Sequence, residues 1–173
     1  MESKRASDLM IPLSEYPHMP YWFTLRQAMA TLRSSRIEVD DKVSLPRAFL
    51  VFNEAYELLG VVRRRDILRG LEPQFERKRR SYPRKLFDVK ADPDLLELGD
   101  DKVAGRIKER AERPVGDVMQ PIKVTLQHDD HLMKIIYEMV ENNLSMIPVL
   151  EDGSVVGVVR SVDVLDEVSK LVL

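Results

Sequence analysis

Two stretches decide the fold of this chain: Gly60-Val61-Val62-Arg63-Arg64-Arg65-Asp66-Ile67-Leu68 and Gly157-Val158-Val159-Arg160-Ser161-Val162-Asp163-Val164-Leu165. They are nearly the same sequence, and each half of the chain opens on a second repeated motif, Asp8-Leu9-Met10-Ile11-Pro12 and Asp117-Val118-Met119-Gln120-Pro121. An internal repeat of this kind constrains the architecture more than any other sequence signal. The sequence therefore predicts two copies of one structural unit.

The second half predicts the order strand, helix, strand, strand, helix. Alternating and continuous apolar runs indicate the strands, and apolar residues at helical spacing indicate the helices. An Asp152-Gly153 turn joins two of the strands, because Asp-Gly tolerates the positive φ angles of a tight hairpin. The predicted elements are a strand at 122–126, a helix over 132–140 capped from 128–130, strands at 146–150 and 155–159, and a helix from Ser161 or Asp163. Pro148 predicts a sheet edge or a bulge.

The first half repeats this order with additions. Thr24 can cap a helix, and residues 48–52 and 58–62 predict the paired strands. Residues 14–23 replace the regular first strand, and an enlarged loop is expected at about 33–47. A charged segment, 72–113, connects the halves; it begins basic, turns acidic, and predicts a short amphipathic helix over Lys102–Glu112.

Composition excludes several classes of protein. The chain has 173 residues, 44% of them hydrophobic and 32% charged, with a net charge of −2 and no cysteine. Disulfide scaffolds, thiol catalysis and cysteine-ligated metals are excluded. No run reaches the roughly 18 apolar residues of a membrane helix, so we expect a cytoplasmic protein that does not enter the membrane.

With these repeats, the chain resembles a tandem pair of cystathionine-β-synthase (CBS) domains, the Bateman module, of the stand-alone type. The resemblance rests on the motifs that open the two halves (residues 8–12 and 117–121, the entry motifs), on Ile147-Pro148-Val149, and on the two repeated turns at 60–66 and 157–163. It implies an α+β fold of two β-α-β-β-α repeats packed as a pseudo-twofold pair, with repeat 1 at 5–71, the connecting segment at 72–113 and repeat 2 at 114–173. It also implies a homodimer, and inter-repeat clefts that hold AMP, ADP, ATP or S-adenosylmethionine.

The resemblance also implies site residues. In the family motif, Gly-apolar-x-Thr/Ser-x-x-Asp, the aspartate binds ribose hydroxyls, and Asp66 and Asp163 occupy that position here. Arg63 and Arg160 stand where the family has Thr or Ser. Each arginine can reach a ligand phosphate, or it can fill the cleft and pair with the neighbouring aspartate. Ile122, Val124 and Pro148 are the expected adenine-pocket residues.

Other interpretations compete with these assignments. Asp66 and Asp163 can cap a helix without any ligand. The run His128-Asp129-Asp130-His131 favours a helix cap over a metal site, since adjacent side chains point apart. The basic run Arg77–Lys85 favours a solvated face over a nucleic-acid contact.

We therefore expect a regulatory module, not an enzyme, because the sequence lacks a Gly-rich phosphate loop, a nucleophile elbow and a catalytic carboxylate pair. It would bind an adenosyl ligand, require no cofactor or metal, and signal through dimer contacts and a regulated partner protein. Neither nucleic acid nor membrane is an expected partner. The alternative is a ligand-free scaffold for protein–protein interaction, with clefts filled by Arg63 and Arg160.

Overall fold

The computed structural model describes residues 4–72 and 100–173. The first half contains α1 (Ala6–Leu9), β1 (Ile11–Pro12), β2 (His18–Pro20), α2 (Leu25–Ser34), β3 (Ile37–Val39), β4 (Lys42–Ser44), β5 (Ala48–Phe52), β6 (Leu58–Arg63) and α3 (Arg64–Leu71). The rest contains α6 (Asp100–Arg110), β7 (Gln120–Pro121), β8 (Leu126–Gln127), α7 (Leu132–Glu141), β9 (Met146–Glu151), β10 (Ser154–Arg160) and α8 (Ser161–Val172).

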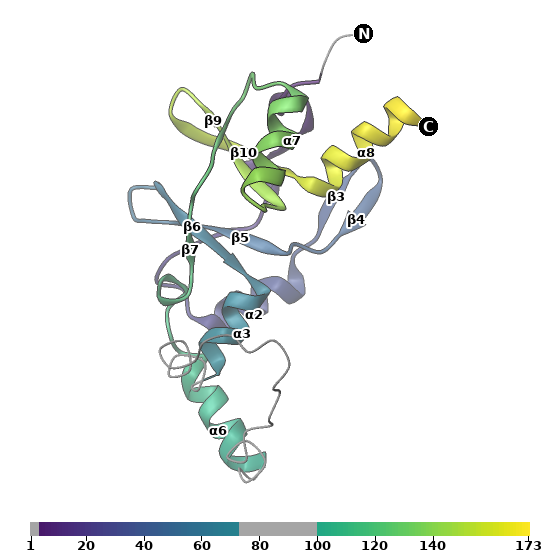
Figure 1. Ribbon diagram of the computed structural model, residues 1–173. Coiled ribbons are helices and arrows are strands. Elements are labelled where there is room, and N and C mark those ends of the chain that lie inside the picture. Colours follow the sequence, from purple (N-terminus) through teal and green to yellow (C-terminus); the bar gives the residue numbers. More distant parts are fainter. Residues whose placement is uncertain (1–3, 73–99) are drawn as a thin grey trace, which may run out of the picture.

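The predicted α+β class and the repeated element order are confirmed. The second repeat runs β8-α7-β9-β10-α8, and the first runs β2-α2-β5-β6-α3 with β3 and β4 inserted. Figure 1 shows α7 and α8 at one end of the paired sheets, and α2 and α3 toward the other. Thr24 begins α2 as expected: its hydroxyl accepts from the Gln27 N–H at 3.2 Å, and the Gln27 side chain accepts from the Thr24 N–H at 2.9 Å.

The two halves exchange their first strands. The sheet orders are β1-β10-β9-β8 and β2-β5-β6-β7, so each sheet receives an edge strand from the entry motif of the other half. The glycine of each repeated stretch permits this contact. A Cβ on Gly60 would lie 2.4 Å from the Gln120 carbonyl oxygen, and one on Gly157 would lie 2.6 Å from that of Ile11. Only glycine therefore fits where the exchanged strands cross.

Three apolar cores follow from this exchange. The core under α7 and α8 includes Ala6 from the first half, and the core under α2 and α3 includes Val115 and Val118 from the second half. A third core lies between the two sheets and is formed by Ile11, Tyr16, Ile37, Leu50, Phe52 and Val158. The repeats are thus joined by a shared apolar layer as well as by exchanged strands.

Three local predictions were wrong. The strand expected at 122–126 is confined to Leu126–Gln127, which pairs in parallel with Val149 and Leu150 of β9. Pro148 does not lie in an edge strand, since β9 runs between β10 and β8, and the bulge of this ladder lies just beyond it, where Val155 pairs with Leu150 and Gly157 with Val149. The helix-capping side chain expected before α7 does not form, and Asp130 instead accepts from the Gln127 N–H at 2.8 Å.

The enlarged loop expected at about 33–47 contains an ordered hairpin, β3–β4. Asp40 and Asp41 form its tip with φ angles of 49° and 61°, the left-handed conformation that a tight hairpin turn requires. The hairpin reaches toward α8 (Figure 1). Lys42 Nζ lies 3.1 Å from Asp166 Oδ1 of α8, and Ser44 Oγ accepts from Arg160 at 2.8 Å. The insertion therefore fastens the first repeat to the second.

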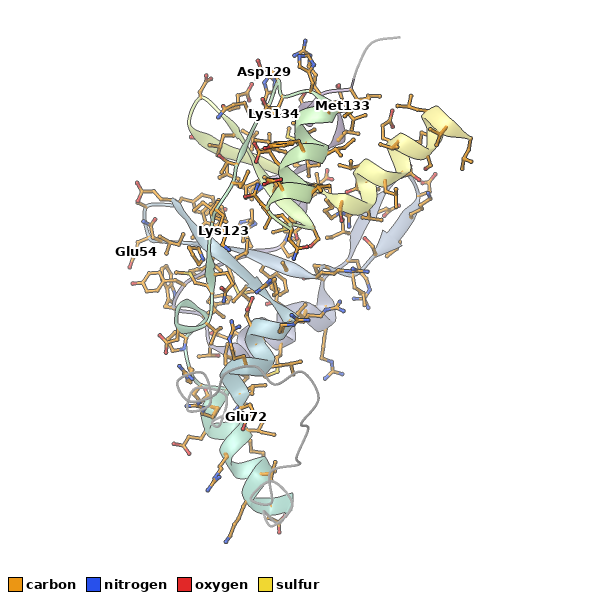
Figure 2. All side chains as sticks on the ribbon, viewed as in Figure 1. Glu54, Glu72, Lys123, Asp129, Met133 and Lys134 are labelled. Atoms are coloured by element: carbon orange, nitrogen blue, oxygen red, sulfur yellow. The ribbon has the colours of Figure 1, made fainter. Side chains whose placement is uncertain are left out.

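The described part of the connecting segment forms α6, close to the helix expected over Lys102–Glu112. The residues that follow α6 are held against α2, because the Leu25 N–H donates to the Arg113 carbonyl at 2.9 Å and Arg26 Nε lies 2.5 Å from Glu112 Oε1. Figure 2 shows Glu72 beside α6. The basic run Arg77–Lys85 lies outside the described residues. Among the helices of 4–72 and 100–173, none is long and apolar enough to cross a membrane.

Candidate ligand-binding clefts

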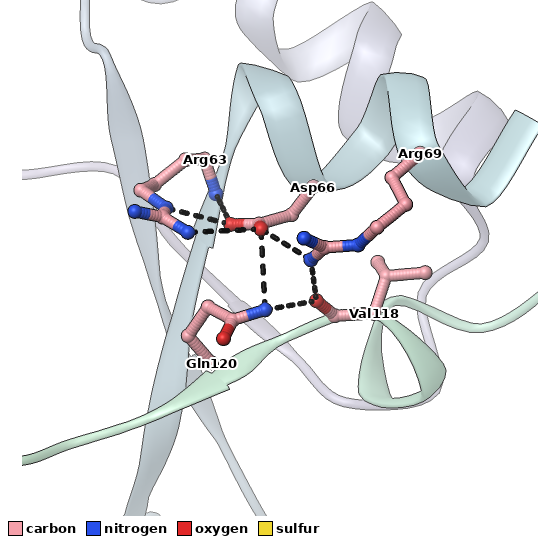
Figure 3. A network of polar contacts seen from close by, with 5 residues as sticks. All are labelled: Arg63, Asp66, Arg69, Val118 and Gln120. Carbon is pink, nitrogen blue, oxygen red and sulfur yellow. Dashed lines mark hydrogen bonds and ion pairs between the residues drawn. The ribbon is translucent and has the colours of Figure 1, made fainter. Parts of the chain in front are cut away.

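The first repeated turn places Asp66 inside a dense polar network (Figure 3). Its side chain is fully buried in the first turn of α3. Oδ2 accepts from the Arg63 backbone N–H and from Arg63 Nε, both at 2.9 Å, and Oδ1 accepts from Arg63 Nη2 at 3.2 Å. Oδ1 also accepts from Arg69 Nη2 at 2.5 Å and from Gln120 Nε2 at 3.2 Å. Both carboxylate oxygens are thus occupied by protein donors.

This network joins the two halves of the chain. Gln120 belongs to the second entry motif, and both Gln120 and Arg69 also donate toward the Val118 carbonyl oxygen, at 3.4 and 3.5 Å. Burial by itself would raise the pKa of Asp66, but the hydrogen bonds and charges of Arg63 and Arg69 hold that pKa below its usual value. Asp66 is consequently an ionised, fully bonded carboxylate at the junction of α3 with the incoming strand.

The second repeated turn holds Asp163 in a simpler pair. Arg160 Nε and Nη2 donate to the two carboxylate oxygens at 2.7 and 2.8 Å, while Arg160 Nη1 donates to Ser44 Oγ at 2.8 Å. The side chains of Arg160 and Asp163 are 14% and 15% exposed. In the repeat, Ile11 takes the place of Gln120, and an isoleucine cannot donate a hydrogen bond. Among residues 4–72 and 100–173, Asp163 therefore has one side-chain partner, Arg160, whereas Asp66 has three partner residues.

A pocket of about 870 Å³ lies between the repeats next to Arg160. Its polar side carries Arg47, Arg64, Arg160 and Tyr16, and we call it the arginine pocket. Its apolar wall comes from α7 and α8, namely Ile136, Met139, Val140, Val164, Leu165 and Val168. A volume of this size, with an apolar wall and a few convergent polar groups, suits a small organic ligand.

A second pocket, of about 530 Å³, lies on the other side of Arg160. Its lining contains Asp163 together with six further carboxylates, so we call it the acidic pocket; the six are Asp8, Glu15, Glu38, Asp40, Asp166 and Glu167. Arg160 lines both pockets. The Arg160 side chain, fixed between Asp163 and Ser44, therefore separates the arginine pocket from the carboxylate that the family motif assigns to ribose.

Tyr16 spans the two repeats beside this partition. Its hydroxyl donates to the Ala48 carbonyl oxygen at 2.8 Å and lies 2.8 Å from Met146 Sδ, so it touches the starts of β5 and β9. Burial raises the pKa of Tyr16, and the nearby positive charge of Arg160 offsets this only in part. The phenol is therefore a neutral group that fixes the spacing between the repeats.

The residues expected to form an adenine pocket lie in the second half of the chain, in and beside its apolar core. Val124 packs against the core beneath α7 and α8, Pro148 is buried in β9, and Ile122 is half-buried. None of the three lines either pocket described above. The sequence analysis instead missed Arg47, Arg64, Tyr16 and Ser44. One sequence signal could have found Arg47 and Arg64: Arg47 precedes and Arg64 follows the two strands that were predicted to pair with each other.

The run His128–His131 does not form a metal site. Asp130 bonds to Gln127 and Lys134, and His128 Nε2 lies 3.6 Å from Glu151 Oε1. Within the part of the chain that the structure describes, no group of three His, Cys, Asp or Glu side chains can hold a metal ion. Figure 2 shows Asp129 and Lys134 at the start of α7.

The fold and clefts define an internally duplicated α+β module with a ligand-sized pocket between its repeats. Residues 115–170 match the CBS domain family, and similar solved structures that span nearly the whole chain are CBS-domain proteins. No curated protein sequence matches it.

Three of these structures illustrate the likeness. A CBS domain-containing protein of unknown function from Kribbella flavida is 15% identical, with a TM-score of 0.67 over 96% of this chain and 98% of that one. CBSX2 in complex with AMP is 16% identical, with a TM-score of 0.62 over 98% of both chains. The cytosolic domain of the Mg²⁺ channel MgtE in complex with ATP is 21% identical, with a TM-score of 0.60 over 96% of this chain and 49% of that one. At these identities the likeness establishes the fold.

Proposed function

We propose that this protein is a regulatory module, not an enzyme, that binds an adenosyl ligand between its repeats. The observation that carries the proposal is the arginine pocket, which is lined by Arg160, the ion-pair partner of Asp163 in the second repeated turn. The AMP and ATP in the complexes of CBSX2 and MgtE support the choice of an adenosyl ligand. A catalytic function has no comparable support, because the side chains that line the pocket include no carboxylate to act as a general acid or base.

Ligand entry would exchange one set of Arg160 contacts for another. In the free protein the Asp163 oxygens accept from Arg160 Nε and Nη2 at 2.7 and 2.8 Å. A ligand phosphate competes for the same guanidinium fork, which matches phosphate and carboxylate geometry equally well. When Arg160 turns to a phosphate, Asp163 becomes free to accept from the two ribose hydroxyls. The arginine at this position thus serves the ligand instead of excluding it.

The signal would pass through a homodimer. The helices that wall the arginine pocket carry exposed apolar side chains, including Val140 at 75% and Leu165 at 68%. Contiguous exposed apolar residues on neighbouring helices are typical of a protein interface. Because Val140 and Leu165 also line the pocket, its occupancy and the contact with a second copy involve the same side chains. A partner protein could then distinguish the two dimer arrangements.

The test is calorimetry with AMP, ATP and S-adenosylmethionine on protein freed of co-purified nucleotide. We expect heat from at least one compound, and its loss in Asp163→Asn. Asp129→Asn is the matched control, since it removes a surface carboxylate at the exposed start of α7, outside the arginine pocket. The proposal fails if no compound binds at millimolar concentration, or if Asp163→Asn binds as the wild type does.

A second candidate is the ligand-free scaffold, and the first repeated turn favours it. Asp66 is fully buried, and its oxygens are bonded by Arg63, Arg69 and Gln120. If Asp163 is held by Arg160 in the same permanent way, both turns are structural and the protein acts only through its surfaces. Sedimentation with and without nucleotide separates the candidates, because the scaffold predicts one dimer under both conditions.

A further inference from the structure

The arginine pocket contains two cations that no carboxylate neutralises. Arg64 Nη2 donates to the Pro46 carbonyl oxygen at 3.0 Å, and Arg47 forms no side-chain hydrogen bond or ion pair with any residue among 4–72 and 100–173. By contrast, Arg160 is paired with Asp163. The lining of the pocket includes no aspartate or glutamate. The pocket therefore carries an excess positive charge next to an apolar wall.

The repeat shows that this charge is particular to one half of the chain. The Arg64 N–H donates to the Arg47 carbonyl at 3.4 Å, and the corresponding bond in the second half runs from the Ser161 N–H to the Ser145 carbonyl at 2.9 Å. Arg47 and Arg64 thus occupy the positions of two serines, and all four residues line the pocket. Two arginines of the first repeat and Arg160 of the second therefore converge on one space.

We propose that the arginine pocket selects adenine nucleotides with more than one phosphate and rejects cationic adenosyl compounds such as S-adenosylmethionine. This rests on the proposed function and specifies its ligand. Arg47 and Arg64 bind the phosphates, because a guanidinium makes paired, charge-assisted hydrogen bonds to phosphate oxygens. Each added phosphate brings about one to two further negative charges into the field of three arginines. A sulfonium ligand brings a positive charge into the same field and is repelled.

The experiment titrates AMP, ADP, ATP, S-adenosylmethionine and inorganic tripolyphosphate into the wild type, Arg47→Gln and Arg64→Gln. Arg65→Gln is the matched control, since Arg65 is an exposed arginine of the same turn that does not line the pocket. We expect affinity to rise from AMP to ATP, and S-adenosylmethionine to give no heat. Each pocket variant should lose about tenfold in ATP affinity, the value of one charge-assisted hydrogen bond, and Arg65→Gln should lose none.

The outcomes separate this inference from the proposed function. If S-adenosylmethionine binds as tightly as ATP, or if both pocket variants keep wild-type ATP affinity, the inference is overturned and the adenosyl module stands. If no adenosyl compound binds, both are overturned. If tripolyphosphate binds as tightly as ATP, the pocket recognises polyphosphates without adenosine, and the proposal that it selects adenine nucleotides is overturned. Circular dichroism of each variant shows that a lost affinity does not reflect a lost fold.

Discussion

Replacing Asp66 with asparagine tests whether the first repeated turn is structural. The substitution keeps the shape of the side chain but removes the charge that faces Arg63 and Arg69. It also places an amide group where one oxygen now accepts from Arg69 and Gln120. These two donors, together with Arg63 Nη2 at the same oxygen, would then point at a donor in a buried site, which is the arrangement that costs most.

The size of the effect follows from the exposure of the partners. Removing one member of a buried ion pair costs about 3–5 kcal/mol when the other charge stays buried. The Arg63 and Arg69 side chains are 49% and 27% exposed, so both can recover water contacts. We therefore expect a loss at the lower end, about 3 kcal/mol of unfolding free energy. For a chain of this size that lowers the Tm by about 6–12 °C.

The assay is thermal and urea unfolding followed by circular dichroism, with Asp163→Asn as the matched variant. The Asp163 oxygens accept two hydrogen bonds, both from Arg160, whereas the Asp66 oxygens accept five from three residues, so the substitution of Asp163 should cost less, about 1–2 kcal/mol. The reasoning is refuted if Asp66→Asn unfolds within about 2 °C of the wild type, or if Asp163→Asn is the more destabilised of the two. Equal urea m-values would show that the unfolded states remain comparable.

Three further predictions follow from the same structure. Gly157→Ala should destabilise the fold by about 1–3 kcal/mol, because its Cβ would meet the Ile11 carbonyl oxygen at 2.6 Å. Gly105 lies in α6 with open space around it, so Gly105→Ala should instead stabilise the fold by up to about 1 kcal/mol in the same urea titration. The folded-state pKa of Asp66 is lowered, so its contribution is present above the unfolded pKa of about 3.9 and is lost as the pH falls through the folded value. The wild type should therefore lose more stability than Asp66→Asn as the pH falls below about 4. Tyr16→Phe should cost about 1–2 kcal/mol by leaving a buried carbonyl without its donor, and an unchanged urea midpoint would contradict this.

The sequence predicted the repeated elements because each carries its own local signal. Thr24 caps α2, as predicted. Asp152 and Gly153 have the positive φ angles, 49° and 79°, that the predicted hairpin turn between the two strands requires. The strand at 122–126 failed because alternation reports which face is buried, not whether a neighbouring strand is present. Residues 122–125 alternate, yet only Leu126 and Gln127 meet a partner on β9.

The candidate site was less predictable than the fold. The family motif identified Asp66 and Asp163 equally, and only the structure shows that Gln120 bonds one of them while Ile11 stands near the other. That difference depends on which strand crosses to which sheet. Arg47 and Arg64 were missed because 16 residues separate them in the sequence; the antiparallel pairing of β5 with β6 brings them together.

Because the two halves exchange their first strands, neither half is a complete structural unit by itself. Neither half closes its own sheet, since β1 completes the sheet of the second half and β7 that of the first. Expressed as separate polypeptides, the halves should behave as complementing fragments that fold on meeting, each donating the strand that the other lacks. In the intact chain, the connecting segment then stabilises the fold by raising the effective concentration of each half near the other. A half expressed alone would keep an open sheet edge, and its nearest substitute partner would be the same half of another copy.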